Sequence, residues 1–464
     1  MHPDNRPTDA LPRPSAMTTA GDPLAPPFAW VPADHPFHAT LHTLATAVAS
    51  DDAAQALVRA GRQADARVQV HAEIKAGRLS SGQWIPARCY WSVQLRDDSA
   101  RLGMRARTMT WDGTGAERLP RWTDLPADPR LPHAQAWFER HAKPGRTRVL
   151  RYVPLRRLTF AWQGDGGDPL IGKFKRRSRH AQAHRLIDHV ATLVALGRPD
   201  FAVAQARQGE PLAGLYFQSA LPGLDLADWL APAAVTGHAT SLRDPVPSRA
   251  ALAHVGHLHA QLHALPKAGK LLPVQTDLSV MLDTACTQLA WIALMQPRCT
   301  EALRAVSARL HRTPGWQADE ARVCHGDLVC SQFLVSPAAG ATTLPTEPQS
   351  WAITDFDLCH VGDPCRDMAI LLASLAYDLP GLAALERRRP DQVDRWVSEV
   401  GQAYLQGYAD TTGVAVNMEG LVWHGLCAEV HYLALMLKKD RYDAVAFDRR
   451  LRHALALCTA RNWT

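Results

Sequence analysis

The feature that most constrains the fold is a change in apolar spacing near residue 222. Before it, five short apolar segments have the length of strands, and one helical stretch separates the third from the fourth. After it, the spacing is predominantly helical. This order predicts a small sheet with one helix, followed by a large helical body. The strand-like segments are Arg148–Tyr152, Leu158–Trp162, Leu170–Phe174, Phe201–Ala206 and Leu215–Leu221, and the helical stretch is Ser178–Leu196.

The helical body is interrupted in one region, 323–357. Two short apolar segments there, Phe333–Ser336 and Trp351–Thr354, are typical of strands. An irregular loop region is therefore expected inside an otherwise helical body. The predicted helices cover 249–264, 277–295, 298–310, 364–378, 391–411, 418–438 and 441–459.

The residues before 147 divide into a leader and a module. Residues 1–33 carry eight prolines, too many for a regular element, and we expect a disordered leader. In the module, apolar residues alternate in two segments joined by a polar turn, which predicts a β-hairpin. The module is expected to hold a helix at 36–62 that stops at Gly61, hairpin strands at Cys89–Leu95 and 102–106, and a helix at Ala134–His141.

Composition excludes several broad classes. The 464 residues suggest roughly three domain-equivalents at about 150 residues each. The net charge of +6 is diluted over the chain, and 47% of residues are hydrophobic, so we expect neither nucleic-acid binding nor global disorder. No apolar run approaches the ~18 residues of a membrane span. Without an export signal, nine scattered cysteines fit a reducing compartment, and we expect a cytoplasmic protein.

The loop region carries the residues with chemical potential. His325-Gly326-Asp327-Leu328 is followed by Gln332, then by Asp355-Phe356-Asp357 and by Gly362-Asp363-Pro364 with Asp367. Phosphoryl transfer needs a carboxylate that accepts a proton from the attacking hydroxyl, and oxygen ligands for the Mg²⁺ on the triphosphate. Asp327 follows a strand-like step, Gln332 can return an amide oxygen to the same cleft, and Asp355 ends the strand at Trp351–Thr354. Each residue alone is more often a cap or turn residue, but the ordered set is far more specific.

This set resembles the aminoglycoside phosphotransferase/choline kinase group, which are protein-kinase-like small-molecule kinases of the phosphotransferase enzyme family. The similarity covers about residues 147–440. It implies an α+β, two-lobed, protein-kinase-like fold with a five-stranded antiparallel sheet and one helix in the small lobe. The resemblance further implies that ATP and Mg²⁺ are the cofactors and that Asp327 is the catalytic base. It implies Gln332 and Asp355 as Mg²⁺ ligands, Asp357 as a further metal-site residue, and His325, Asp363 and Asp367 as structural support.

The upstream half supports the same interpretation. A kinase of this kind needs a lysine on a strand to pair with the phosphates, and Lys173 lies in Leu170–Phe174. Between 141 and 185, twelve Lys and Arg face two acids, although Arg176, Arg177 and Arg179 are expected on the surface. The stretch at Ser219, Ala220 and Leu221 resembles the inter-lobe linker, whose backbone would bind adenine.

Two departures from the family pattern bear on function. The helix after Lys173 contains no Glu, and its one carboxylate, Asp188, is a poor candidate for the usual ion pair with the lysine. Gln332 stands where most of the family has Asn. The same Gln occurs in the maltokinase-like branch, which also has an extra N-terminal module, and this favours a sugar-like acceptor.

Three alternatives remain open. Gly167–Lys173 matches the G-x4-G-K pattern of a P-loop, but Phe174 replaces the Ser or Thr that holds Mg²⁺. Four cysteines flank the motif loops and suggest zinc, but their spacing is unlike that of zinc sites. A nucleotide-binding pseudokinase with a scaffolding role would account for the missing helix acid. The four cysteines are Cys324, Cys330, Cys359 and Cys365.

We therefore expect a phosphotransferase that moves the γ-phosphate of ATP to a hydroxyl of a small molecule, either sugar-like, aminoglycoside-like or an amino-alcohol. Its partner is that acceptor, and the oligomeric state stays open. The predicted parts are a leader (1–33), an accessory module (34–146), a small lobe (147–221) and a large lobe (222–464).

Overall fold

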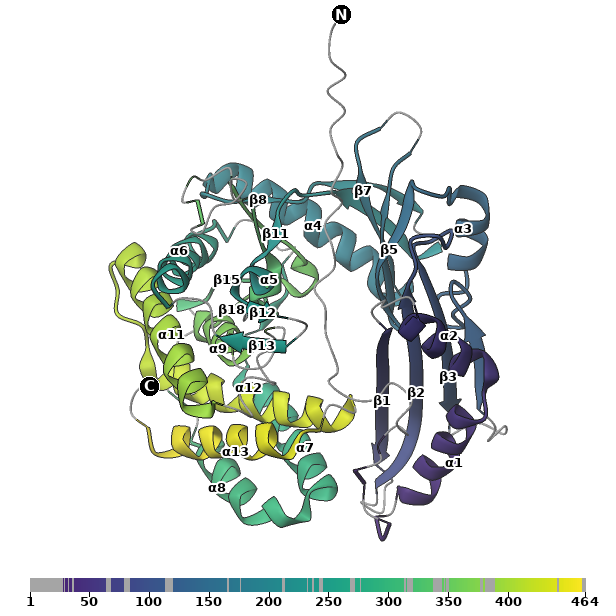
Figure 1. Cartoon of the computed structure of the whole chain (residues 1–464). Coiled ribbons are helices and arrows are strands. Elements are labelled where there is room, and N and C mark those ends of the chain that lie inside the picture. The colour runs from purple at the N-terminus through teal and green to yellow at the C-terminus, as the bar shows by residue number, and fades with distance from the viewer. Residues whose placement is uncertain are drawn as a thin grey trace, which may run out of the picture.

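The computed structural model confirms an α+β chain with several sheets and a large helical part (Figure 1). Nearly all of the predicted leader lies outside the described residues. The structure describes residues 28, 30–31, 33–35, 37–63, 68–78, 84–112, 120–164, 167–175, 177–210, 213–231, 233–235, 238–241, 245–267, 272–275, 277–312, 314, 320–336, 344–345, 347, 350–375, 379, 389–439 and 442–460.

The accessory module is a four-stranded antiparallel sheet with helices on it. The predicted hairpin is present as β2 and β3, and the predicted helix at Ala134–His141 is α3. Two strands on either side of the hairpin, β1 and β4, were not predicted and complete the order β1-β2-β3-β4. The bounds are α1 His38–Ala49, α2 Asp52–Gln63, β1 Val68–Arg78, β2 Trp84–Arg96, β3 Met104–Asp112 and β4 Arg121–Asp124.

The single helix predicted at 36–62 is two helices. The helix is interrupted at Ser50 and Asp51. Asp51 caps the second helix by accepting a hydrogen bond from the Ala54 N–H at 2.7 Å. Gly61 does not stop the helix, which continues to Gln63. Instead, a Cβ at Gly61 would lie 2.1 Å from Val68, so the glycine allows α2 to approach β1 closely.

The small lobe has the predicted five-stranded antiparallel sheet and single helix. The strand order is β5-β6-β7-β10-β9, and every pair in it is antiparallel. The predicted position of the fourth strand, Phe201–Ala206, is wrong. Ala202–Val203 (β8) pairs with a large-lobe strand, and Ala206–Glu210 (β9) joins this sheet. The bounds are β5 Thr147–Val153, β6 Arg157–Trp162, β7 Leu170–Lys175, α4 Arg177–Gly197 and β10 Leu215–Ser219.

The large lobe is helical, with short strands around the motif loops. The predicted helices and both strand-like segments are present, and several short elements were not predicted. The helices are α5 Leu226–Leu230, α6 Pro245–His263, α7 Leu278–Met295, α8 Thr300–Leu310, α9 Pro364–Leu375, α11 Pro390–Thr412, α12 Met418–Lys438 and α13 Ala444–Thr459. The strands are β11 Leu224–Asp225, β12 Ala233–Val235, β13 His238–Ser241, β14 Val274–Gln275, β15 Arg322–Cys324, β16 Phe333–Val335, β17 Trp351–Ile353 and β18 His360–Gly362.

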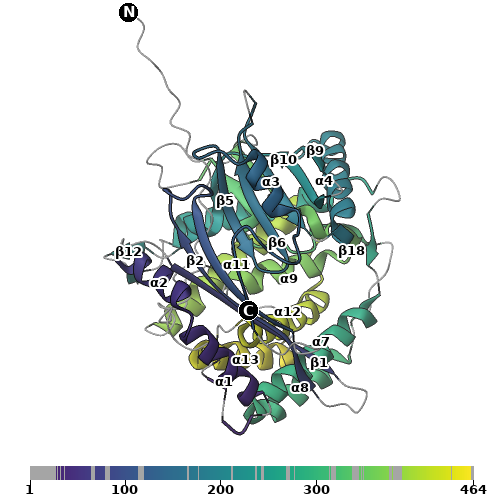
Figure 2. The ribbon, with the colours of Figure 1, turned by 90° about the vertical axis from the view of Figure 1, so that its right-hand side faces the viewer.

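The accessory module packs against both lobes. One apolar core joins α1, α2 and the sheet β1–β3 to α7, α8, α12 and α13 of the large lobe, with Phe37 and Trp291 rings 5.9 Å apart. A second core joins Trp137 and Phe138 of α3 to the small-lobe sheet. In Figure 2, β1 and β2 cross in front of the helices at the bottom of the large lobe. The module therefore bridges the two lobes from one side.

Two large-lobe helices, α7 and α12, have the length and hydropathy of a membrane span, with mean hydropathies of 1.4 and 1.2. In α12, 83% of that apolar window is buried inside the fold, as in the core helix of a globular lobe. In α7 the share is 33%, and its apolar residues Trp291, Ile292 and Met295 belong to the core shared with the accessory module.

Candidate active site

The two lobes meet at a cluster of opposite charges. Lys173, on β7 of the small lobe, places its Nζ 2.8 Å from Asp355 Oδ1, just after β17 of the large lobe. Arg157, at the start of β6, contacts the other oxygen of Asp355 at 3.3 Å. Lys173 is 6% exposed. Two residues singled out from sequence are thus brought together across 182 positions of the chain.

A second pair lies beside the first. Lys175 forms an ion pair with Asp357, and the Tyr216 hydroxyl donates to the other oxygen of Asp357 at 3.0 Å. The period of two in a strand puts Lys173 and Lys175 on one face of β7. Arg157, Lys175 and Tyr216 were not identified from sequence. The two-residue spacing of the lysines and of the aspartates was the available signal.

The charges reinforce one another. Burial by itself raises the pKa of Asp355, but Lys173, Arg157 and Lys175 outweigh it and hold this pKa well below its usual value. Burial likewise opposes the charge on Lys173, and Asp355 more than compensates, so the pKa of Lys173 is raised. Both groups are therefore charged at neutral pH, and the cluster presents the ionised carboxylate of Asp355 between the lobes.

Asp355 is held in an unusual backbone conformation. Its φ is 67° and its ψ is 44°, in the left-handed region that non-glycine residues rarely adopt. Such conformations cost about 1–3 kcal/mol and concentrate at functional sites. The conformation turns the chain from β17 into the short 3-10 turn at Phe356–Leu358, with Asp355 and Asp357 both facing the small lobe.

The loop after β15 carries the predicted catalytic base. Asp327 is exposed there, between the buried Gly326 and Leu328. Gly326 has φ +88°, and a Cβ on it would lie 2.3 Å from the Leu358 carbonyl oxygen, so the loop needs glycine to pack against the turn after Asp355. His325 fixes the same contact, because its Nε2 lies 2.8 Å from the Thr354 carbonyl oxygen. The structural role of His325 stays a prediction.

Gln332 lies beside the strand that ends at Asp355. Its backbone carbonyl accepts from the Thr354 N–H at 2.9 Å, and its side-chain Oε1 accepts from the Thr354 hydroxyl at 3.2 Å. Gln332 is thus held beside Thr354, the residue that precedes Asp355. Its amide oxygen and the Asp355 carboxylate are both hard oxygen donors of the kind that Mg²⁺ prefers.

Asp367, at the start of α9, holds the motif loop from below. Its carboxylate accepts from the backbone N–H groups of His325 and, at 2.9 Å, of Gly326. His259 and His263, one turn apart on α6, place their Nε2 atoms 3.8 and 3.7 Å from Asp367 Oδ2. All of these side chains are buried. Asp367 therefore holds the backbone just before Asp327.

Asp363, four residues before Asp367, also holds a loop in place through its carboxylate. It accepts from the Cys365 N–H at 2.9 Å, where α9 begins, and it lies 2.9 Å from His424 Nε2 on α12. It ties the loop after β18 to two helices, α9 and α12.

The predicted adenine-binding linker follows β10. The Ser219 N–H donates to the Gln205 carbonyl oxygen at 2.9 Å and the Ala220 N–H to that of Pro169 at 3.2 Å. Within the described parts of the chain, the Leu221 N–H has no such partner. Of the three predicted residues, Leu221 therefore offers the amide best placed to serve a ligand.

The structure bears on two of the alternatives, the P-loop and a zinc site formed by cysteines. Gly172 and Lys173 lie inside strand β7, which pairs antiparallel with β6, so the P-loop interpretation is wrong. All four cysteines that flank the motif loops are free and buried. Among the described residues, the group of His, Cys, Asp and Glu that approaches metal-site spacing contains none of them and consists of His259, His263 and Asp367.

The missing helix acid is a real departure. Asp188 is exposed on α4, and the described carboxylate that pairs with Lys173 is Asp355. In this structure the carboxylate paired with Lys173 thus belongs to the residue predicted to hold the metal.

We expect the buried histidines to make the protein sensitive to acid. Burial, aided by the neighbouring His263, lowers the pKa of His259 to about 3. Because the unfolded chain takes up this proton near pH 6.5, the free energy of unfolding should fall as the pH drops from about 6.5 toward 3, by up to ~1.4 kcal/mol per pH unit per histidine. Urea unfolding at pH 5–8 measures this, and His259→Gln should flatten the slope by about one proton. His42→Gln, on the exposed side of α1, should leave the slope unchanged; an unchanged slope in His259→Gln would contradict the assignment.

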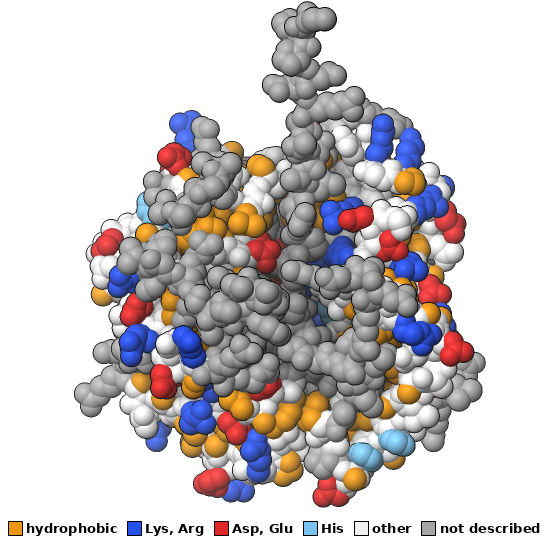
Figure 3. All heavy atoms as spheres, viewed as in Figure 1, with side chains coloured by type: hydrophobic (Ala, Val, Ile, Leu, Met, Phe, Trp, Pro, Cys, Tyr) orange, Lys and Arg blue, Asp and Glu red, His pale blue; other side chains and the backbone are white. Residues whose placement is uncertain are grey.

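The surface around the site mixes both signs of charge. In the space-filling view, basic side chains gather at the hollow between the two halves of the molecule, next to acidic ones (Figure 3).

Comparison with known proteins places the site in context. Residues 156–414 match the model of the Phosphotransferase enzyme family. Among solved structures, macrolide 2'-phosphotransferase MphH from Brachybacterium faecium is 18% identical, with a TM-score of 0.41 over 72% of this chain and 99% of that one. A choline/ethanolamine kinase family protein from Mesorhizobium loti is 17% identical, with a TM-score of 0.40 over 68% and 88%. The aminoglycoside phosphotransferase APH(3'')-Id from Streptomyces rimosus is 17% identical, with a TM-score of 0.38 over 60% and 89%. A comparison with curated proteins gives no match.

Proposed function

Because the chain belongs to the phosphotransferase enzyme family, we propose that it transfers the γ-phosphate of ATP, bound with Mg²⁺, to a hydroxyl group of a small molecule. That the chain is a small-molecule phosphotransferase follows from its family. The proposed use of ATP and Mg²⁺ is supported by one observation, the contact of 2.8 Å between Lys173 of the small lobe and Asp355 of the large lobe. It puts a phosphate-binding cation and an ionised carboxylate at one point between the lobes.

The residues present fit a magnesium ion. Asp355 is held ionised, and the amide oxygen of Gln332 and the carboxylate of Asp357 lie on the neighbouring turns. Asp355 and Gln332 would hold the ion, with Asp357 beside them, and the ion would neutralise charge on the triphosphate. Lys173 and Arg157, which contact Asp355 in this structure, are the cations that would turn to the phosphate oxygens.

The remaining roles fall to the motif loop and the linker. Asp327, exposed on a loop that is braced from behind, would orient the acceptor hydroxyl and take its proton as the oxygen attacks the γ-phosphorus and ADP leaves. The Leu221 N–H would bind the adenine. A sugar-like acceptor, an aminoglycoside-like one or an amino-alcohol would each present the required hydroxyl, and we place the reaction in the cytoplasm.

We expect the protein to be stabilised by ATP only when Mg²⁺ is also present. A ligand at 100 times its Kd adds about 2.7 kcal/mol to the free energy of unfolding, enough to raise the Tm measurably. Asp355→Asn should lose this rise, because it removes a charged metal ligand. The matched control is Asp188→Asn, an exposed carboxylate on α4, which should keep it.

The same measurement separates the alternative. A rise in Tm with ATP that ignores both Mg²⁺ and Asp355 would indicate a nucleotide-binding pseudokinase, in which the Lys173–Asp355 pair is purely structural. No rise under any condition would contradict the proposed function.

A further inference from the structure

The turn between β5 and β6 of the small lobe has an unusual backbone. Val153 and Arg157 pair at the ends of the two strands, and the Arg156 N–H closes the turn by donating to the Val153 carbonyl oxygen at 3.1 Å. Leu155, at the centre of the turn, has a φ of 61°, in the left-handed region. This conformation is unfavourable for a leucine and persists only where surrounding contacts enforce it. Those contacts therefore set the shape of the turn.

The main contact comes from Asp128 of the accessory module. Asp128 lies between β4 and α3 and is only 4% exposed. Its Oδ2 accepts from the Leu155 N–H at 2.8 Å and from the Tyr152 hydroxyl at 3.0 Å, and its Oδ1 accepts from the Arg130 N–H at 2.8 Å. Burial and the nearby Asp128 carboxylate raise the pKa of Tyr152, so its hydroxyl keeps the proton that it donates. One buried carboxylate thus holds both the centre of the turn and the strand that leads into it.

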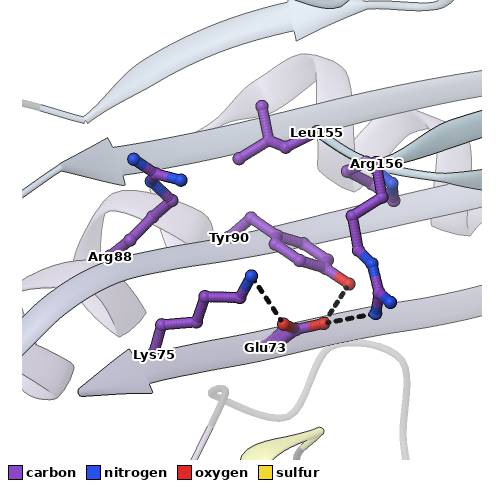
Figure 4. A pocket seen from close by; sticks show the side chains of 7 residues that line it. Glu73, Lys75, Arg88, Tyr90, Leu155 and Arg156 are labelled. Atoms are coloured by element: carbon purple, nitrogen blue, oxygen red, sulfur yellow. Dashed lines mark hydrogen bonds and ion pairs between the residues drawn. The ribbon is translucent and has the colours of Figure 1, made fainter. Parts of the chain in front are cut away.

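A second carboxylate of the accessory module reaches the same turn. Glu73 of β1 lies 3.8 Å from Arg156 Nη1 and accepts from the Tyr90 hydroxyl of β2 at 3.1 Å. Figure 4 shows Leu155 and Arg156 of the turn across from Tyr90 and Glu73 of the sheet. The Arg156 side chain is half-exposed, and such an ion pair contributes little by itself. Asp128 is therefore the stronger of the two tethers.

The turn leads directly into a residue of the candidate active site. Arg157 contacts Asp355 at 3.3 Å, and it stands opposite Lys175 in the pairing of β6 with β7. Lys175 in turn forms an ion pair with Asp357. Arg157 thus joins the cluster of charges between the lobes only two residues after the N–H that Asp128 holds. A shift of the turn would move Arg157 relative to Asp355.

We infer that Asp128 is a positioning residue for nucleotide binding, because it fixes through the turn at 154–156 the place of Arg157, a cation proposed to bind the phosphates of ATP. Asp128 acts through the Leu155 N–H rather than by contact with the nucleotide. The accessory module thereby takes part in nucleotide binding. The inference rests on the proposed function, because Arg157 meets a phosphate only if the chain binds ATP.

The experiment is a double-mutant cycle between Asp128→Ala and Arg157→Gln in the full chain, with the Kd of AMP-PNP and Mg²⁺ measured by calorimetry. Each single variant should weaken binding about tenfold or more, since a hydrogen bond to a charged group is typically worth that factor. The double variant should bind no more weakly than Arg157→Gln, because both changes remove the same interaction. Adenosine, which has no phosphate, should bind Asp128→Ala as it binds the wild type.

Two further variants separate positioning from a loss of stability. Asp128→Asn keeps one carbonyl oxygen, and its Kd should lie between those of the wild type and Asp128→Ala. This variant tests the inference even if the alanine variant does not fold. The matched control is Gln94→Leu, which removes another buried hydrogen bond from the module to β5, the one of 3.1 Å to the Tyr152 carbonyl oxygen. It should lower the Tm and leave the Kd of AMP-PNP unchanged.

Three other outcomes would overturn the inference. An unchanged Kd in Asp128→Ala and Asp128→Asn, or losses that add in the double variant, would show that Asp128 only stabilises the fold, and the proposed function would stand. A parallel loss of adenosine and AMP-PNP affinity would indicate a general distortion of the small lobe. If AMP-PNP does not bind the wild-type chain at all, the proposed function fails, and the role of Asp128 fails with it.

Discussion

Asp327→Asn should lower the rate of phosphoryl transfer by about 10²- to 10⁴-fold, because general-base help is typically of that size. Asn has the same shape but cannot take the hydroxyl proton. The side chain is exposed and the loop is held through the backbone of its neighbours, so the fold should be unaffected. The measurement is the single-turnover rate of ADP release with an accepted substrate, together with the Kd of AMP-PNP, which should remain within about twofold.

The control is Asp391→Asn, an equally exposed carboxylate at the start of α11. It should keep the full rate. Wild-type turnover by Asp327→Asn would show that another group accepts the proton, and the assignment of roles would have to be abandoned.

Asp367→Ala should lower the free energy of unfolding by about 3–5 kcal/mol. The change leaves the buried N–H groups of His325 and Gly326 without their acceptor, at about 1–3 kcal/mol each, and it opens a cavity beside His259 and His263. Burial opposes the charge of Asp367, but the two histidines hold its pKa well below the usual range. Urea unfolding at pH 7 measures the loss.

The conservative change gives the internal control. Asp367→Asn keeps one carbonyl oxygen for one of the two N–H groups and should cost less than the alanine variant. A loss under about 1 kcal/mol in Asp367→Ala would mean that the loop keeps its structure without this carboxylate.

Local patterns determined what could be foreseen of the fold. The strands at 147–175 and the helix α4 are bounded by turns and have clear periodicity, so they were predicted almost to the residue. The fourth small-lobe strand was misplaced, because the predicted apolar run Phe201–Ala206 covers all of β8 and only the first residue of β9, and these two strands join different sheets. Strand β1 was not predicted, although Val68, Val70, Ala72 and Ile74 alternate with polar residues in the pattern of a half-buried strand.

The candidate site was predicted where a motif carries it. Asp327, Gln332 and Asp355 stand at fixed spacings within one loop region, and the structure keeps them on adjoining turns. Arg157 could not be found this way, because its importance comes only from the approach of β6 to Asp355 across 198 positions. Likewise, the exchange of a helix acid for Asp355 as the partner of Lys173 is decided by packing between lobes. The catalytic roles of Asp327, Gln332 and Asp355 stay predictions.

The accessory module shares an apolar core with each lobe, with Phe37 against Trp291 on one side and Trp137 against Phe160 on the other. Interiors this closely packed resist sliding. A rotation of the lobes about their linker would have to shear one of these two cores. The contact between Phe37, just before α1, and Trp291 of α7 is therefore one of the two places that would limit a rotation of the lobes. In mechanical terms the module is a rigid brace between the two lobes. Substitutions that change its rigidity are therefore a way to change the rate of turnover.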